Sequence, residues 1–147
     1  MHANSFISDK LSRLYDVVVM IFRSKELNLL RCLAKNQRWH LRIIKNFKTY
    51  SIEVLDNDHL DVFLKSSSEN ITACAINLLE RIRTYSRNGR DWVPSCMKAR
   101  FENVPEFKTF EELELNLVLM GSYSANLNYE IRPKRFKRSK RIFIVEY

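Results

Sequence analysis

Glycine is scarce in this sequence, with only Gly89 and Gly121 in a chain of 147 residues, where the usual share is about 7%. Phosphate-cradling loops, nucleophile elbows and dinucleotide fingerprints need glycine, because their backbone takes positive φ or approaches a ligand closely. Neither glycine lies in such a pattern. The sequence therefore argues against these enzyme classes, and we expect a protein that is not an enzyme.

Long apolar runs and paired cysteines are missing as well. The longest apolar run, residues 17–22, has six residues, whereas a membrane-spanning helix needs roughly 20. The first residues lack the basic and apolar regions of a secretory signal. The three cysteines, Cys32, Cys74 and Cys96, are odd in number and far apart, which favours free thiols in a reducing compartment. We expect an intracellular protein of the cytoplasm or nucleus.

Metal-binding patterns are weak. An acidic cluster of Asp56, Asp58, His59 and Asp61 has the spacing of ligands, but it lacks the glycine and the final glutamate of a calcium loop. A hairpin turn built from Asx residues explains this cluster better. The cysteines and histidines form no C-x-x-C or H-x-x-x-H pair, as structural zinc sites usually do. We expect no metal and no cofactor.

Catalytic patterns are equally weak. Cys96 has no local histidine partner that would indicate a nucleophile pair. Glu112 and Glu114 are interpreted as the polar face of a strand rather than as paired carboxylates, with Glu111 just before them. We predict no catalytic residue.

Basic charge is concentrated in one short run. The net charge is +8, from 25 Lys and Arg against 17 Asp and Glu, and Arg132–Arg141 holds seven basic residues and no acid. Without that run the balance is 18 basic against 17 acidic residues. Like charges in sequence repel one another and cost stability, so the run indicates a partner that supplies negative charge. Its candidate anion-binding residues are Arg132, Lys134, Arg135, Lys137, Arg138, Lys140 and Arg141.

Two smaller basic groups accompany the run. One consists of Arg81, Arg83 and Arg87, with Arg90 following. The other is spread over residues 38–50, where four basic residues alternate with aromatic ones. Cations neutralise phosphates and rings stack on unpaired bases, so this mixture suits nucleic acid. Candidate aromatic contacts are Trp92 and Phe136.

The apolar periodicity predicts helices and strands in the first two thirds of the chain. Spacings of three and four predict a helix over 9–35, with Ser8 as its cap and a possible break at Asn28. Alternation predicts strands over 39–43, 50–54 and 60–64. Ser66 and Glu69 form a capping-box pattern before an amphipathic helix that runs to Ser86, with Gly89 as its stop.

Alternation returns in the last third. It predicts strands over 97–101, 113–119, 123–131 and 142–147, with one helical turn at 109–112 and a chain reversal at 121–122. The basic run lies between the last two strands, which makes residues 132–141 a basic hairpin loop. We predict one α+β domain over residues 1–147, with a mostly antiparallel sheet packed against an N-terminal helix and a central amphipathic helix.

These features predict a small nucleic-acid-binding protein, viral or regulatory, that grips the phosphates of RNA or DNA mainly through the basic run. The bias toward Asn, Lys, Ile and Phe is that of an AT-rich genome, such as a viral one. One alternative is a matrix-like or adaptor protein that docks on an anionic membrane surface, with Phe136 inserting at the interface. Another is a module that binds a host protein, with the basic run as a nuclear-import signal. A homodimer paired through an edge strand at 142–147 is a further expectation.

Overall fold

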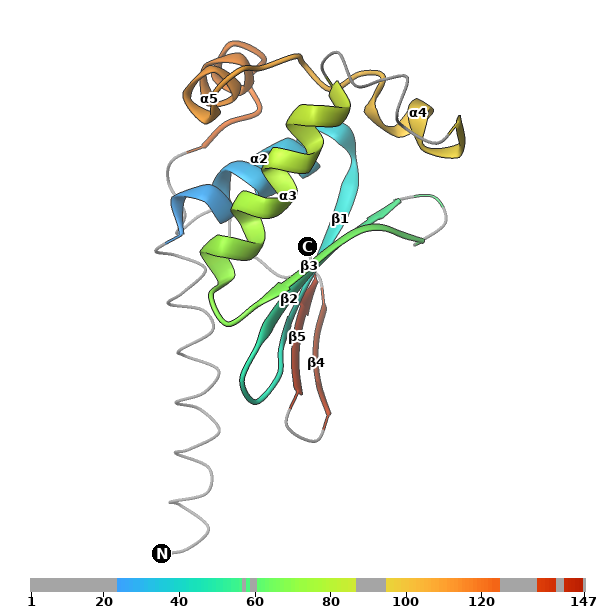
Figure 1. The fold of residues 1–147 in the computed structure, drawn as a ribbon, viewed down its shortest axis with the longest axis vertical. Coiled ribbons are helices and arrows are strands. Elements are labelled where there is room, and N and C mark those ends of the chain that lie inside the picture. Colours follow the sequence, from blue (N-terminus) through green and yellow to red (C-terminus); the bar gives the residue numbers. More distant parts are fainter. Residues whose placement is uncertain are drawn as a thin grey trace, which may run out of the picture.

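The computed structural model describes residues 24–56, 58, 61–86, 95–124, 135–139 and 142–146, with the backbone alone for 95–97, 135–139 and 142–146. Its five-stranded sheet has the order β3-β2-β1-β5-β4, and every neighbouring pair is antiparallel. Helices α2 and α3 pack together against this sheet (Figure 1). The predicted α+β class is confirmed. The strands are β1 (Trp39–Lys45), β2 (Tyr50–Asp56), β3 (Val62–Ser68), β4 (Arg135–Ser139) and β5 (Ile142–Glu146).

Helix α2 spans Lys25–Gln37 and begins at a polar cap. The Ser24 hydroxyl accepts a hydrogen bond of 3.1 Å from the backbone N–H of Leu27, which satisfies a donor that the first helical turn leaves free. The predicted helix is confirmed over 25–35, and residues 9–23 lie outside the described residues. The helix continues through Asn28, so a break there was a wrong expectation. The Asn28 amide donates to the Ser124 carbonyl at 3.0 Å and its oxygen accepts from the Arg31 side chain at 2.6 Å, so these bonds leave the helix backbone uninterrupted.

Helix α3 spans Ile71–Ser86 and buries one apolar face. The expected cap at Ser66 was wrong, because β3 continues to Ser68. Asn70 caps the helix instead: its side-chain oxygen accepts hydrogen bonds from the N–H groups of Thr72 at 2.8 Å and Ala73 at 3.3 Å. The predicted stop at Gly89 lies outside the described residues.

The main core lies between these two helices and the sheet. Alternate residues of β1 and β2 point into it, as period-two patterning requires. The face of α3 fills it from the other side with side chains at helical spacing. The fully buried members include Leu30, Leu33, Leu41, Ile43, Ile52, Val54, Leu64, Ile71, Leu78, Leu79 and Ile82.

The strands predicted over 97–101 and 113–119 are helices, α4 (Ser95–Phe101) and α5 (Phe110–Leu119). In α5 the alternating leucines include a pair four residues apart, Leu113 and Leu117, and a helix places such a pair on one face. Both are fully buried against the core. The Thr109 hydroxyl caps the helix by accepting from the Glu112 N–H at 3.1 Å. The alternating leucines therefore led to a wrong prediction of a strand, although Thr109 and Glu112 form a capping pattern that indicates a helix.

The basic run is partly strand. Residues 135–139 form β4, so the expected hairpin loop over 132–141 was too long. The predicted last strand is confirmed as β5, but β5 lies between β1 and β4 rather than at an edge. Gly121 makes the predicted reversal with φ of 72°. Of the strand expected over 123–131, residues 123 and 124 are not in a strand, and the rest lie outside the described residues.

None of the helices in the described part of the chain combines the length and the apolar character that crossing a bilayer would take.

Candidate nucleic-acid interface

The β1–β2 and β4–β5 hairpins point to the same end of the sheet. Strand β1 pairs antiparallel with both β2 and β5, and Lys45 lies opposite Tyr50 on one side and Phe143 on the other. The turn between β1 and β2 and the end of the β4–β5 hairpin therefore lie together, on the side of the sheet away from α4 and α5 (Figure 1). We call this region the hairpin end, defined as the described residues 43–52, 135–139 and 142–145.

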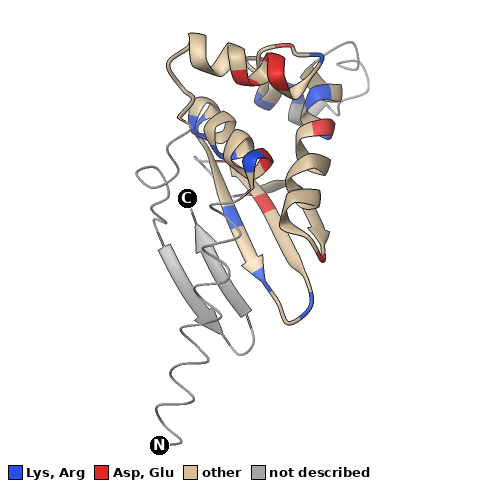
Figure 2. Ribbon diagram, turned by 90° about the vertical axis from the view of Figure 1, so that its left-hand side faces the viewer, with Lys and Arg blue, Asp and Glu red and all other residues tan. Residues whose placement is uncertain are grey.

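The hairpin end is strongly basic. Its residues include five Lys and Arg and no Asp or Glu. Figure 2 shows basic residues at the end of β1 and in the turn after it. Glu146, opposite Arg135, is the first acidic residue of β5 beyond these segments. Like charges gathered at one end of the sheet add up to a positive potential over that region of the surface. The five residues are Lys45, Lys48, Arg135, Lys137 and Arg138, and in the sequence Lys140 and Arg141 stand between β4 and β5.

An exposed aromatic side chain lies in the β1–β2 turn. Phe47 is 69% exposed, and its backbone N–H donates to the Asn46 side-chain oxygen at 2.7 Å. The Asn46 N–H in turn donates to the Thr49 carbonyl at 2.9 Å. These bonds fix the turn, and Phe47 stays at its tip with Lys48 beside it. An aromatic ring held in solvent between cations is suited to stack on a flat ligand.

Lys45 is held near this turn by an aromatic contact. Its Nζ atom lies 4.3 Å from the centre of the Tyr50 ring, within the range of a cation–π interaction. Tyr50 is largely buried, so the contact fixes the ammonium group at the surface of the sheet. The turn thus presents Lys45, Phe47 and Lys48 as an ordered group.

A row of alternating charge borders the basic region within the sheet. Arg42 Nη1 lies 3.1 Å from Glu53 Oε1, and Lys65 Nζ lies 3.9 Å from the other oxygen of the same carboxylate. The strand register continues the row, since Glu146 lies opposite Arg42 and Arg135 lies opposite Glu146. Arg42 and Lys65 therefore have an acidic partner. In the register Lys45, Lys137 and Arg138 lie opposite uncharged residues.

The structure separates the predicted arginines of α3 from β4. Arg81 donates to the backbone carbonyl of Lys65 at 2.8 Å, and Lys65 belongs to β3, at the opposite edge of the sheet from β4. Arg83 makes two bonds to one carboxylate oxygen of Glu80, at 2.6 and 2.9 Å. Both side chains thus have local protein partners, away from the hairpin end.

The remaining predicted residues fall into two groups. Arg135, Phe136, Lys137 and Arg138 lie on β4 by backbone position. The predicted residues outside the described part of the chain are Arg132, Lys134, Lys140, Arg141, Arg87 and Trp92.

Sequence reasoning did not select Lys45, Phe47 and Lys48 as site residues. They belong to the alternating basic and aromatic stretch of residues 38–50, but nothing in that pattern separates exposed from buried rings. Trp39, from the same stretch, packs edge-to-face on Phe63 and Phe101, at centroid distances of 5.3 and 5.8 Å. A four-residue turn between two strands is the signal that would have selected Phe47, since side chains at such tips are exposed.

No family model, curated protein or solved structure matches this chain. The hairpin end therefore has to be interpreted from its own geometry and charge.

Other chemistry receives no support in the described residues. They contain no group of three His, Cys, Asp or Glu side chains placed to hold a metal ion. Asp56 accepts a hydrogen bond of 2.9 Å from the Asp58 N–H, which is the Asx turn that the sequence predicts, and its Oδ2 lies 3.4 Å from Arg100 Nε. Cys32 and Cys74 are free and buried. Burial is the main cause that raises the pKa of the Cys74 thiol, so its nucleophilic thiolate is disfavoured.

Proposed function

We propose that this chain binds nucleic acid, RNA or DNA, at the hairpin end, mainly through phosphate contacts. The observation that carries the proposal is the convergence of two hairpins at one end of a sheet, whose described residues there hold five basic and no acidic residues. Lys140 and Arg141, between β4 and β5 in the sequence, add two more basic residues to the same run. Phosphates supply the negative charge that this surface lacks, and their binding releases condensed counterions. Lys45 and Lys48 join the basic run in this role.

The exposed Phe47 favours single-stranded over double-stranded nucleic acid. Bases of a duplex are stacked on one another, whereas an unpaired base has a free face for an aromatic ring. Each such stacking contact contributes about 1–3 kcal/mol and tolerates any base. Sequence-independent binding with a preference for single strands is the mode that this arrangement supports.

The same surface also suits an anionic membrane, which is the second candidate. A ring beside two lysines at a protruding turn, as at Phe47, is able to insert at a lipid interface while the cations contact headgroups. The basic run also resembles a nuclear-import signal. We place the protein inside the cell, in the cytoplasm or nucleus, as part of the same proposal.

Fluorescence anisotropy with labelled 20-nucleotide single strands and duplexes of RNA and DNA, over a range of salt, tests the proposal. Wild-type protein is expected to bind with an affinity that falls steeply with salt. The Lys45→Ala/Lys48→Ala variant is expected to lower the slope of log K against log salt by about 1.4–1.8, because each lost phosphate contact removes about 0.7–0.9.

The matched control is Lys25→Ala/Lys108→Ala, which removes the same charge from two exposed positions away from the hairpin end. We expect it to leave the slope nearly unchanged. Phe47→Ala is expected to weaken single-strand binding about ten-fold and duplex binding much less. A Lys134→Ala/Arg135→Ala/Lys137→Ala/Arg138→Ala variant is expected to lose most of the binding.

Two outcomes count against the proposal. If the control weakens binding as much as Lys45→Ala/Lys48→Ala, net charge rather than the hairpin end determines affinity. If the protein binds no nucleic acid at low salt but sediments with vesicles containing phosphatidylserine, the membrane reading replaces the nucleic-acid one.

A further inference from the structure

Helix α5 exposes an apolar surface at its C-terminal half. Leu115, Val118 and Leu119 are 57%, 50% and 76% exposed, and Met120 follows at 48%. The first three have i, i+3 and i+4 spacing, which places them side by side on the helix. We call Leu115, Val118 and Leu119 the α5 stripe. Other large exposed apolar side chains in the described residues (Phe47, Val62 and Ile76) come from three separate elements.

The surroundings of the α5 stripe are acidic, although the chain is basic. Residues 102–124 contain five Glu and one Lys, whereas the whole chain has a net charge of +8. Glu111 and Glu114 lie one turn before the stripe, and α5 has no Lys or Arg of its own. A surface that combines exposed leucines with carboxylates, on a helix that has no basic residue, fits a partner that is both apolar and basic.

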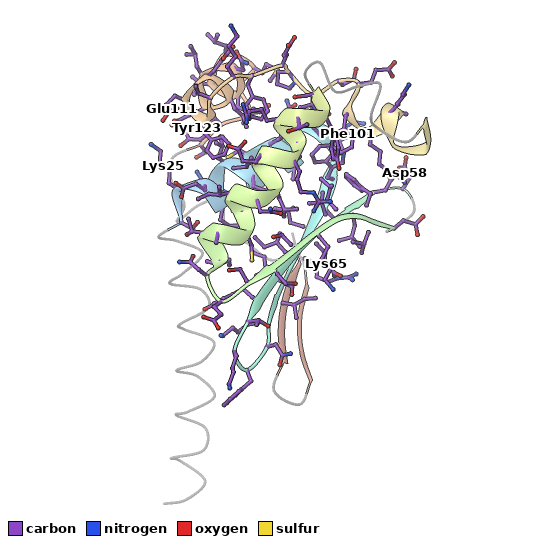
Figure 3. All side chains as sticks on the ribbon, viewed as in Figure 1. Lys25, Asp58, Lys65, Phe101, Glu111 and Tyr123 are labelled. Carbon is purple, nitrogen blue, oxygen red and sulfur yellow. The ribbon has the colours of Figure 1, made fainter. Side chains whose placement is uncertain are left out.

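A shallow cavity of about 70 Å³ adjoins α5 at the beginning of α2. Burial raises the pKa of the Tyr123 hydroxyl in its wall, and a hydrogen bond to the Glu114 carboxylate raises it further. Figure 3 shows Lys25, Glu111 and Tyr123 close together in this part of the molecule. Glu111 and Glu114 therefore belong to both the cavity and the helix that carries the stripe. The lining residues are Lys25, Glu26, Leu29, Phe110, Glu111, Glu114 and Tyr123.

We infer that the α5 stripe is the docking surface for a basic amphipathic helix of another protein. Apolar residues of that helix pack on Leu115, Val118 and Leu119, in the way that amphipathic helices are recognised by apolar surfaces. Lysine or arginine residues beside its apolar face lie against Glu111 and Glu114, where the cavity leaves room for a side chain. This surface is distinct from the hairpin end and does not depend on the nucleic-acid proposal.

A second copy of this chain fits the surface less well. In a symmetric dimer α5 would face α5, and neither helix has a basic residue to pair with the glutamates of the other. The stripe consists of three side chains, whereas a standard protein interface buries roughly 800 Å² on each partner. A single helix needs less area and supplies the missing positive charge.

The test uses two labelled 18-residue peptides with one leucine face each, one carrying lysine at all other positions and one carrying glutamate. Fluorescence anisotropy is expected to show that the lysine peptide binds wild-type protein at least ten-fold more tightly than the glutamate peptide. Leu115→Ser/Leu119→Ser is expected to weaken the lysine peptide at least ten-fold, and Glu111→Lys at least three-fold. Ile76→Ser, which removes an exposed apolar side chain from α3, is the matched control and is expected to leave binding unchanged. Circular dichroism verifies that each variant is folded.

Three results would overturn the inference. The first is equal binding of the lysine peptide to wild type and to Leu115→Ser/Leu119→Ser. The second is tighter binding of the glutamate peptide that the stripe variant abolishes. The third is a wild-type dimer in analytical ultracentrifugation that Leu119→Ser dissociates, since the occupant would then be a second copy.

Discussion

The Arg81 guanidinium, on α3, donates a hydrogen bond of 2.8 Å to the backbone carbonyl of Lys65 on β3. Strand β3 is one of the two edges of the sheet, and edge strands carry backbone groups without a strand partner. This bond ties the edge strand to the helix that covers the sheet. Arg81, a candidate phosphate ligand from sequence, therefore has a structural role in the fold.

Replacing Arg81 is expected to affect stability more than nucleic-acid binding. Arg81→Ala should lower the free energy of unfolding by about 0.5–1.5 kcal/mol, the usual net contribution of one hydrogen bond. Urea denaturation measures the change. Lys65→Ala is the control, because it keeps the carbonyl acceptor and loses only a surface ion pair, and we expect it to cost less than about 0.5 kcal/mol. An Arg81→Ala variant as stable as wild type would show that the bond contributes nothing.

The cap of α3 gives a second prediction. Asn70→Ala should lower the free energy of unfolding by about 1 kcal/mol, because the N–H groups of Thr72 and Ala73 lose their acceptor. Ser66→Ala changes the residue that the sequence pattern selects as the cap, but Ser66 lies inside β3. Thermal denaturation of both variants distinguishes the two positions: a larger loss for Ser66→Ala would contradict the observed helix start.

Helix α5 makes a third prediction, which separates a helix from a strand. In the helix Leu117 is fully buried and Leu115 is 57% exposed, whereas an alternating strand would place both on one face. Leu117→Ala should cost about 2–5 kcal/mol, as for other buried leucines, and Leu115→Ala less than about 0.5 kcal/mol. Chemical denaturation tests this, and similar losses for the two variants would contradict the helix.

Cys74 gives a prediction about pH. Burial raises the pKa of its thiol in the folded protein above the ordinary value of 9.0, which the unfolded chain keeps. Below that value both states hold the proton, so Cys74 has no effect on the pH dependence. As the pH rises above it, the unfolded state loses the proton first, and stability falls.

The measurement is urea denaturation at several pH values from 8 to 10.5, with Cys74→Ala as the comparison. The variant is less stable throughout because a cavity remains, but its stability should fall less steeply above pH 9. Parallel pH profiles for the two proteins would show that the thiol does not titrate differently in the folded state. We also expect the Cys74 thiol of the folded protein to react slowly with labelling reagents, because burial disfavours its thiolate.

The sequence by itself determined those helices and strands whose apolar pattern fits only one type of secondary structure. The face of α3, from Ile71 to Ile82, repeats at helical spacing over three turns, and the first three strands alternate apolar and polar residues between short connecting turns. It also located the excess charge, because seven basic residues in ten need no fold to be recognised. These features gave the α+β class and the proposal of an anionic partner.

Only the tertiary structure decided the rest. Leu113 to Leu119 satisfies both a strand and a helix period, and burial of Leu113 and Leu117 against the core selected the helix. The partner of Arg81 is the backbone carbonyl of Lys65 on another element, which no local pattern reveals, whereas Arg83 pairs with Glu80 at i,i+3 spacing within α3. The pairing of β1 with β5 joins segments about a hundred residues apart. That pairing brings Lys45, Phe47 and Lys48 to the basic run, because a sheet register is set by packing of the whole core rather than by neighbours in sequence.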